Sequence, residues 1–373
     1  MKSIVEEALS RHKAFEAHEQ APDAAIAARD TRVDSELREI LSKLKTNIRI
    51  VGCGGGGCNT ISRIAEEGIH GADLYAANTD AQHLLAIRSP SKILLGRRAT
   101  RGLGAGALPL VGEEAARESK EEIAKSLTGS DVVFVTCGLG GGTGTGGAGV
   151  ISKIAKDAGA LVVAVVTLPF KGEGRMRMEN AEWGLDRLRK TADTVVCVPN
   201  DKLVELYPRL PLNQAFRVAD EVLMRSIKGL TEVVSKPGLV NLDFNDFKTI
   251  MKGAGVAMIG LGESEATGED RAVEAISEAI NSPLLDVDIS NASGILVNVV
   301  GGEDMSIREA ERVAEELQTR VNQNARIIWG ATVDPTMENK IRVMVVATGV
   351  SSRQIVGRPS AEEMRRGPIE TVR

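Results

Sequence analysis

Two glycine-rich segments constrain the fold of this chain more than any other feature of its sequence. One runs from Gly52 to Asn59 and the other from Gly138 to Gly147. Each follows a short apolar run of the strand type and precedes a stretch with helical spacing. Backbone N–H groups without side chains around them can wrap an anion, and the start of a helix adds a favourable dipole. The sequence therefore predicts two phosphate-binding turns at the ends of two strands.

Apolar runs and helical segments alternate from residue 47 to about residue 198. The run from Leu161 to Leu168 is apolar throughout, as expected of a parallel strand that is buried on both faces. The repeated strand–helix pattern predicts an α/β fold with a doubly wound parallel sheet. The predicted strands lie at 48–51, 73–77, 132–136, 161–168 and 194–198, and the predicted helices at 59–67, 113–127 and 177–190.

A long apolar stripe at helical spacing predicts a central helix that Pro237-Gly238 ends. A second alternation of strands and helices follows it and predicts a smaller α/β unit. The polar C-terminal end is expected to be a disordered tail. The predicted organisation is a helical N-terminal extension and linker (1–46), a nucleotide-binding domain (47–211), the central helix (212–236), a C-terminal domain (237–350) and the tail (351–373).

The bulk composition narrows the class of protein. The net charge is −5 with both signs mixed along the chain, which argues against a nucleic-acid partner. The sequence has no apolar run of about 18 residues and no apolar signal core after Met1, so we expect a cytoplasmic protein without a membrane span. The four cysteines show no paired CxxC spacing, so we expect neither a disulfide nor a metal site.

The first glycine segment, taken alone, allows a rival interpretation. Gly52, Gly54 and Gly57 match the G-x-G-x-x-G pattern of NAD-dependent dehydrogenases, with Asp73 or Asp80 as the acid that would bind the ribose. The segment is not a Walker A loop, because no Gly-Lys-Ser/Thr follows it.

The second glycine segment favours a triphosphate ligand. A dinucleotide needs one pyrophosphate cradle, which would leave the residues from Gly140 to Gly147 without a role. Two glycine turns in one sheet can grip a triphosphate from both sides. Thr143 and Thr145 are expected to add hydroxyl donors where glycine offers only N–H groups.

With both glycine segments taken together, the chain resembles the tubulin/FtsZ superfamily. The run Gly-Gly-Gly-Thr-Gly-Thr-Gly over residues 140–146 is similar to the signature loop of that superfamily, and the likeness extends from about Ile48 to Gly349. Further motifs resemble FtsZ of the archaeal type rather than tubulin. They are Asn78-Thr79-Asp80, Gly102-Leu103-Gly104-Ala105-Gly106, Pro199-Asn200-Asp201-Lys202-Leu203 and Pro237 to Phe244.

The resemblance implies a set of nucleotide-binding residues. Cys58 departs from the family pattern, and its backbone N–H is expected to serve in place of a side chain. Glu173 and Arg177 are implied near the ribose and phosphates, although their spacing also suits a helix-start salt bridge. Asp220 is implied at the guanine edge, where a carboxylate accepts hydrogen bonds that adenine does not offer. The full set is Gly55, Gly56, Gly57, Cys58, Asn59, Asn78, Gly142, Thr143, Gly144, Glu173, Arg177 and Asp220.

The resemblance also implies that hydrolysis uses a distant acidic segment. Asn241, Asp243 and Asp246 follow the central helix, and in the family this segment enters the nucleotide site of the next subunit. Judged by residue type alone, the same segment is a polar turn with helix-capping residues. Loops at one end and acids at the other would make a heterologous contact, which repeats into an open filament.

The implied function is that of a self-polymerising cytoskeletal GTPase of the cell-division ring. It would use GTP, with Mg²⁺ held through the nucleotide phosphates. Its implied partners are further copies of itself, head to tail, and a membrane-tethering adaptor that binds the tail or the N-terminal helix. A regulatory or scaffold member of the family, which binds nucleotide without dividing cells, remains an alternative.

Overall fold

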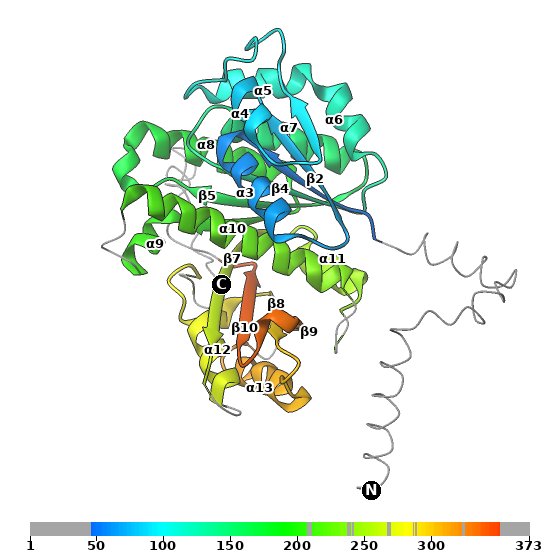
Figure 1. The fold of residues 1–373 in the computed structure, drawn as a ribbon, viewed down its shortest axis with the longest axis vertical. Coiled ribbons are helices and arrows are strands. Elements are labelled where there is room, and N and C mark those ends of the chain that lie inside the picture. Colours follow the sequence, from blue (N-terminus) through cyan, green and yellow to red (C-terminus); the bar gives the residue numbers. More distant parts are fainter. Residues whose placement is uncertain are drawn as a thin grey trace, which may run out of the picture. The chain divides into compact units, whose positions relative to one another are not determined.

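A computed structural model shows the fold (Figure 1). It describes residues 46–206, 211–236, 240, 242–266, 270–285, 287, 289–322 and 325–350. The expected N-terminal extension and C-terminal tail lie outside the described residues.

Among the described residues, the strands join into one ten-stranded sheet with the order β3-β2-β1-β4-β5-β6-β7-β10-β8-β9. All neighbours from β3 to β7 run parallel, β10 is antiparallel to β7 and β8, and β9 is parallel to β8. The strands are β1 (Ile48–Cys53), β2 (Ala72–Asn78), β3 (Ser91–Leu94), β4 (Val132–Gly138), β5 (Leu161–Leu168), β6 (Thr194–Pro199), β7 (Gly255–Ser264), β8 (Gly294–Gly301), β9 (Arg326–Val333) and β10 (Ile341–Thr348).

The predicted doubly wound parallel sheet is confirmed, and its strand order places a ligand site. Along the sheet the order runs 3-2-1 and then 4-5-6, so it reverses beside β1. In open α/β sheets, ligands bind outside the carboxyl ends of the strands at this switch point. Both glycine segments begin there, because the first follows β1 and the second follows β4.

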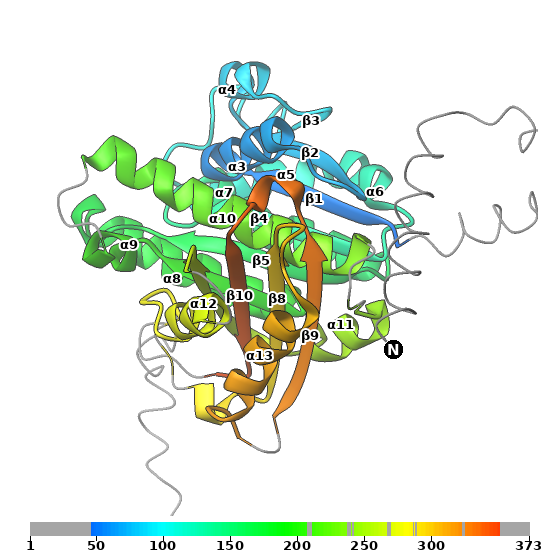
Figure 2. The same ribbon diagram turned by 60° about the horizontal axis from the view of Figure 1, so that its bottom comes forward.

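Helices cover both faces of the sheet (Figures 1 and 2). One apolar core packs α3 and α10 on one face, and the other packs α5 to α8, α12 and α13 on the opposite face. The helices are α3 (Gly54–Glu67), α4 (Ala81–Ala86), α5 (Pro109–Glu118), α6 (Lys120–Leu127), α7 (Thr143–Asp157), α8 (Arg175–Thr191), α9 (Asn200–Leu206), α10 (Leu212–Ser235), α11 (Phe244–Met251), α12 (Asp270–Ile280) and α13 (Ile307–Gln318), with three short 3₁₀ turns η1 (Lys171–Glu173), η2 (Ile289–Asn291) and η3 (Pro335–Met337).

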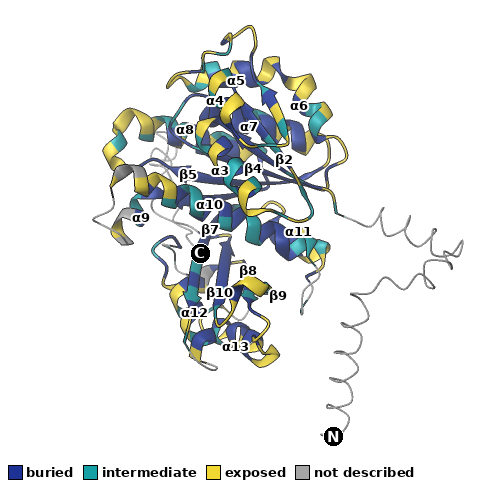
Figure 3. Ribbon diagram, in the orientation of Figure 1, coloured by how far each residue is buried: buried dark blue, intermediate teal, exposed yellow. Residues whose placement is uncertain are grey.

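The central helix α10 is buried along most of its length, as its broad apolar stripe predicts (Figure 3). Leu223, Ile227 and Leu230 are at most 1% exposed. The helix packs against α3 and against β5, β8 and β9, which lie in the N-terminal and C-terminal parts of the sheet. Because it is buried on several sides, it holds the two α/β parts of the chain together.

Two features of the fold add to the sequence expectations or correct them. β6 pairs with β7 from Thr194–Gly255 to Cys197–Met258, so one continuous sheet runs through both α/β parts. The predicted helix 113–127 is two helices that break at Ser119, whose hydroxyl accepts a hydrogen bond from the Gly96 N–H at 3.0 Å. At Ser119 the backbone leaves the helical region (φ −90°, ψ 16°), while the hydroxyl holds the neighbouring loop.

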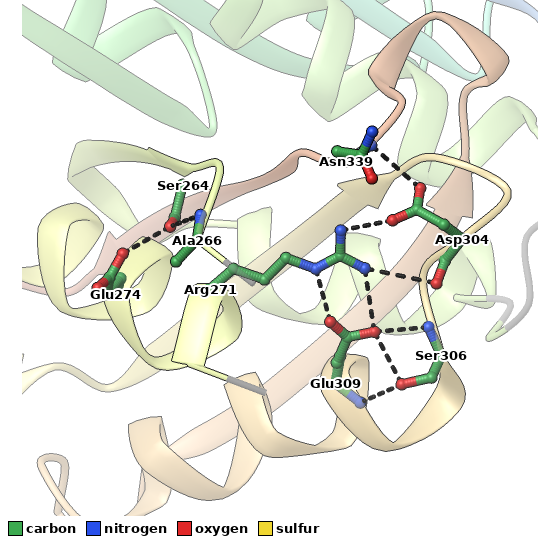
Figure 4. A network of polar contacts seen from close by, with 8 residues as sticks. All are labelled: Ser264, Ala266, Arg271, Glu274, Asp304, Ser306, Glu309 and Asn339. Carbon is green, nitrogen blue, oxygen red and sulfur yellow. Dashed lines mark hydrogen bonds and ion pairs between the residues drawn. The ribbon is translucent and has the colours of Figure 1, made fainter. Parts of the chain in front are cut away.

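A buried arginine holds together the C-terminal α/β part (Figure 4). Arg271 on α12 donates to Glu309 on α13 at 2.6 Å and to Asp304 at 2.5 Å. The Glu309 hydrogen bond raises the pKa of Arg271 above its usual value, against the opposing effect of burial. Glu309 also closes a capping box with Ser306, so one carboxylate caps α13 and anchors it to α12.

Among the described helices, none combines the length and the apolarity that a bilayer crossing requires.

Candidate functional site

Three glycine-containing segments meet where the strand order reverses. A Cβ placed on Gly54 would lie 2.7 Å from the Gly144 nitrogen, so the first two segments touch backbone to backbone. Gly54 also has a φ of +73°, which favours glycine. A Cβ on Gly142 would lie 3.0 Å from the Cβ and carbonyl oxygen of Ala105, which brings in the segment from Gly102 to Gly106. These close approaches explain why the residues are small.

The two main segments place two helix N-termini side by side. Helix α3 begins at Gly54 and α7 begins at Thr143, and neither has a side-chain cap. The first intrahelical bond of α7 runs from the Gly146 N–H to the Gly142 carbonyl, so the N–H groups before Gly146 have no acceptor within the helix. Two uncapped helix N-termini form a site for a polyanion.

The glycines of the site fall into two kinds. A Cβ on Gly57 would clash with the Thr136 carbonyl oxygen, so packing within the protein requires this glycine. A Cβ on Gly55 or Gly141 would meet no protein atom within 4 Å, and neither residue has a positive φ. Protein packing does not explain glycine at these two positions. Glycine at such open positions permits the close approach of a ligand to the backbone.

The two threonines of the signature loop do different work, and one expectation is wrong. The Thr145 side chain is 1% exposed, and its hydroxyl accepts the Gly140 N–H at 3.0 Å. It therefore shapes the turn rather than facing a ligand. The Thr143 hydroxyl lies 2.6 Å from the Thr79 hydroxyl, which ties the signature loop to the end of β2.

Cys58 is buried in the core rather than exposed in a loop. Its thiol lies 3.6 Å from the carbonyl oxygens of Gly52 and Ala77. Burial raises the pKa of Cys58 to about 12, so the thiolate is absent at neutral pH. Cys58 is the fifth residue of α3, where the N–H bonds the carbonyl four residues before it. The Cys58 N–H is therefore used within the helix. The N–H groups of Gly54, Gly55 and Gly56 are the donors that α3 can offer to a ligand.

The remaining three cysteines are buried and free as well. Burial raises the pKa of Cys137 and Cys197 to about 12 and that of Cys53 well above its ordinary value. In the part of the chain that the structure describes, no group of three or more His, Cys, Asp or Glu residues is arranged to hold a metal ion.

Asn59 and Asn78 are brought together by a residue that sequence reasoning missed. Asn59 lies on α3, one helical turn after Gly55, and Asn78 ends β2. His83 on α4 lies 3.2 Å from the amide of each. The sequence carried a signal, because His83 follows Asn78-Thr79-Asp80 closely, but a lone histidine gives no indication of its partners.

Glu173 and Arg177 form the helix-start ion pair that their spacing allowed. The Glu173 carboxylate accepts a hydrogen bond from Arg177 and another from the Phe170 N–H at 2.9 Å. The Arg177 side chain is half exposed. A Cβ on Gly140 would lie 2.9 Å from the Arg177 carbonyl oxygen, so the pair borders the second glycine segment.

Asp220 on α10 faces α3, where its carboxylate lies 3.8 Å from Arg63. The Asp220 side chain is 20% exposed. Within the described part of the chain, no hydrogen-bond donor lies on its oxygens, so both can accept donors from a ligand. Burial raises the pKa of Asp220 to about 6, against the lowering effect of Arg63. Arg63 also lies 3.6 Å from Glu221, and sequence reasoning missed it.

The acidic segment leads into α11. Asp243 is the N-cap of this helix and accepts the Asn245 N–H at 3.1 Å, as its residue type suggested. Asp246 lies in the first turn, and both acids are exposed. The buried Leu242 and Phe247 anchor the segment. Asn241 lies outside the described residues.

The acids and the glycine segments belong to different edges of the sheet. The glycine segments follow the carboxyl ends of β1 and β4. The last residue of α11, Met251, accepts a hydrogen bond from the hydroxyl of Thr194, which begins β6 at the amino edge. In the described residues, no hydrogen bond or ion pair joins Asp243 or Asp246 to the glycine segments.

Comparisons with known proteins show the family of this chain. The model of the tubulin/FtsZ family GTPase domain matches residues 47–208, and that of the FtsZ family C-terminal domain matches residues 255–351. Cell division protein FtsZ 1 of Archaeoglobus fulgidus is 56% identical over 374 residues, which cover 100% of each chain. Cell division protein FtsZ of Haloferax mediterranei is 59% identical over 328 residues, which cover 88% of this chain and 86% of that one.

A solved structure supports the same assignment. The empty FtsZ dimer of M. jannaschii superimposes with a TM-score of 0.82 at 55% identity, covering 86% of this chain and 92% of its own. The dehydrogenase alternative is thereby overturned. The chain belongs to the FtsZ family of tubulin-like GTPases, a family whose archaeal members it matches over its whole length.

Proposed function

We propose that this GTPase polymerises head to tail and hydrolyses GTP at the junction between subunits, as part of the cell-division ring. The observation that carries the proposal is the separation of the two halves of the site. Uncapped helix N-termini lie at the carboxyl edge of the sheet, and the acids precede a helix that ends at the amino edge. A subunit stacked on the next would bring one edge against the other.

In this proposal the nucleotide phosphates bind the N–H groups at the starts of α3 and α7. Gly55 and Gly56 offer backbone donors at the start of α3, Gly142 and Gly144 offer them at the start of α7, and Asn59 lies on the same face of α3 as the first two. Asp220 reads the guanine edge, because an ionised carboxylate with free oxygens accepts both the N1 and N2 donors of guanine. Glu173, Arg177 and Asn78 border the site.

Asn241, Asp243 and Asp246 of the neighbouring subunit would orient or deprotonate the attacking water. Exposure of the two acids supports this role, because a buried acid could not reach another subunit. Mg²⁺ would be held chiefly by the phosphates and would offset their charge, since no cluster of protein ligands occurs among the described residues. Loss of the terminal phosphate removes contacts across the junction, so filaments should weaken after hydrolysis.

The first test measures GTP turnover per subunit against protein concentration, with light scattering recorded alongside. We expect turnover to rise above a threshold concentration together with the scattering. Turnover per subunit that stays constant at every concentration would refute the shared site. It would leave a GTPase that acts as a monomer.

A second test separates the two halves of the site by mixing variants. Asp246→Asn retains the nucleotide half, and Asp220→Asn weakens nucleotide selection while retaining the acids. We expect each variant alone to turn over GTP slowly and the mixture to recover activity at junctions that pair two intact halves. No recovery in co-sedimenting mixed filaments would argue against sharing.

The role at the division site and the adaptor form a separate part of the proposal. Support comes from the relatives in Archaeoglobus fulgidus and Haloferax mediterranei, which are named cell division proteins. Fluorescent full-length chain in its own host should gather at mid-cell before constriction. Versions lacking residues 1–45 or 351–373 should polymerise normally, and the version that no longer localises identifies the adaptor-binding segment. Normal division without the protein would favour a scaffold role instead.

A further inference from the structure

His83 sits between two asparagines of the proposed nucleotide site and contacts both. Its Nδ1 lies 3.2 Å from Asn78 Nδ2, and its Nε2 lies 3.2 Å from Asn59 Oδ1. Asn78 ends β2 and Asn59 belongs to α3, so the ring joins two elements that meet at the carboxyl edge of the sheet. None of the steps proposed so far uses this histidine.

A neighbouring backbone group fixes the direction of these hydrogen bonds. The Thr79 N–H donates to Asn78 Oδ1 at 2.9 Å, so the oxygen of that amide is occupied and its NH₂ group faces His83. His83 Nδ1 must then accept, and in a neutral ring Nε2 must carry the proton. The Nε2–H therefore donates to Asn59 Oδ1. The order of donors and acceptors runs in one direction from Thr79 to Asn59.

This direction of hydrogen bonding determines which group of the Asn59 amide is left for a ligand. With its oxygen bonded to His83, the Asn59 amide presents its NH₂ group to the exposed side of α3. Phosphate and ribose ring oxygens accept hydrogen bonds but do not donate them. An asparagine that could rotate its amide would present its oxygen to these groups part of the time and repel them. One that is fixed with NH₂ outward is a permanent donor.

The backbone around His83 is itself held firmly. The His83 N–H donates to the Asp80 side chain at 3.0 Å, which caps α4. The Ala81 N–H donates to the Gly102 carbonyl at 3.0 Å, which ties α4 to the third glycine-containing segment. The imidazole therefore reaches Asn59 from a fixed support rather than from a free loop.

We propose that His83 is a positioning residue of the nucleotide site: it holds the Asn59 amide with its NH₂ group toward the bound phosphates. The inference rests on the proposed nucleotide role of Asn59. Glutamine can replace the ring, because its amide offers one acceptor and one donor at a similar separation. Leucine has a similar bulk and offers neither.

The test measures GDP affinity of unpolymerised protein for His83→Leu and His83→Gln. We expect His83→Leu to weaken binding about threefold to tenfold, the usual effect of one hydrogen bond. His83→Gln should retain most of the parental GDP affinity. Gln82→Leu, a polar-to-leucine change at the exposed neighbouring position on α4, should bind as the parent does. Equal weakening in the Gln and Leu variants would overturn the proposal.

A double-mutant cycle distinguishes positioning from general damage to the fold. In an Asn59→Ala background, His83→Leu should change affinity by less than about twofold, because the group it positions is gone. An undiminished effect in that background would show that His83 acts elsewhere and would overturn the inference. If Asn59→Ala alone leaves GDP affinity unchanged, the nucleotide role assigned to Asn59 fails, and the inference fails with it for that separate reason.

Discussion

The glycine segments and the acidic segment before α11 are held in place by opposite means. The glycine segments are packed backbone to backbone, and Gly57 and Gly144 are buried. The acidic segment is anchored by Leu242 and Phe247 below it, while Asp243 and Asp246 point into solvent. A site for phosphates needs fixed N–H groups, which only close packing provides. A group that completes another subunit's site must instead stay exposed until that subunit arrives.

The largest expected effect comes from the exposed acids. Asp246→Asn keeps the side-chain shape and should lower GTP turnover about 100-fold or more, because it removes a group that orients or deprotonates water. GTP affinity of the monomer should not change. Asp270→Asn, which alters an exposed acid in the first turn of α12, serves as the control. Parental turnover in Asp246→Asn filaments would remove this acid from the site.

A smaller effect on stability should distinguish the glycine that is packed against protein, Gly57, from the open glycine, Gly55. Gly57→Ala places a methyl group against the Thr136 carbonyl oxygen, and we expect it to lower the free energy of unfolding by roughly 1–3 kcal/mol. Gly55→Ala meets no protein atom and should leave stability unchanged while weakening nucleotide binding. Urea unfolding of nucleotide-free protein measures the first effect and a binding titration measures the second. Equal losses of stability would contradict the distinction.

The next prediction concerns pH and Asp220. Its folded pKa of about 6 is raised above the ordinary value, so the charged form is disfavoured by folding and this cost grows as pH rises toward 6. Guanine recognition needs the charged form, so affinity for GTP should fall roughly tenfold as pH drops through about 6, the loss of a charge-assisted hydrogen bond. The preference for GTP over ATP should shrink with it. Nucleotide titrations between pH 5 and 8 measure both.

Arg63 provides the matched comparison for that pH profile. Its charge favours the ionised form of Asp220, so Arg63→Gln should move the midpoint to higher pH. Arg225→Gln removes the same charge from α10 itself, where Arg225 pairs with Glu221 rather than with Asp220. It should leave the midpoint in place. A profile without any midpoint near pH 6 in the parent protein would contradict the role of Asp220.

The smallest expected effect belongs to Cys58. Cys58→Ala removes a buried sulfur and should lower the free energy of unfolding by about 1 kcal/mol. Nucleotide affinity should be unchanged, because the thiol faces the core and burial raises its pKa to about 12. Calorimetric unfolding and a binding titration test the two halves of this prediction. A clear loss of affinity would assign the residue to the site after all.

The regular parts of the fold were predictable because their patterns are local. The apolar run from Leu161 to Leu168 forms the buried strand β5, and the stripe over 212–236 forms α10. Pairings between distant segments were not predictable. Nothing local in Thr194 or Gly255 shows that β6 and β7 lie side by side, and nothing local at Ser119 shows that its hydroxyl accepts the Gly96 N–H.

The candidate site divides in the same way. The glycine segments were found because glycine-rich turns have a distinct composition, whereas the role of the acids was implied only by the family resemblance. His83 and Arg63 were missed, because a single histidine or arginine gains its meaning only from the side chains beside it. The expectation for Thr145 was wrong for a related reason. Its residue type suits a ligand, but its burial turns the hydroxyl to the Gly140 N–H.

By itself, the sequence determined that two glycine turns follow two parallel strands, because strand, turn and helix signals are carried by neighbouring residues. Only the tertiary structure decided which of those glycines are packed against protein and which are open, since that depends on which distant backbone lies opposite each Cα. The fold also decided that the acids belong to the other edge of the sheet. In a parallel sheet, all carboxyl ends lie at one edge and all amino ends at the other. No local sequence pattern shows which of the two edges a distant segment will reach.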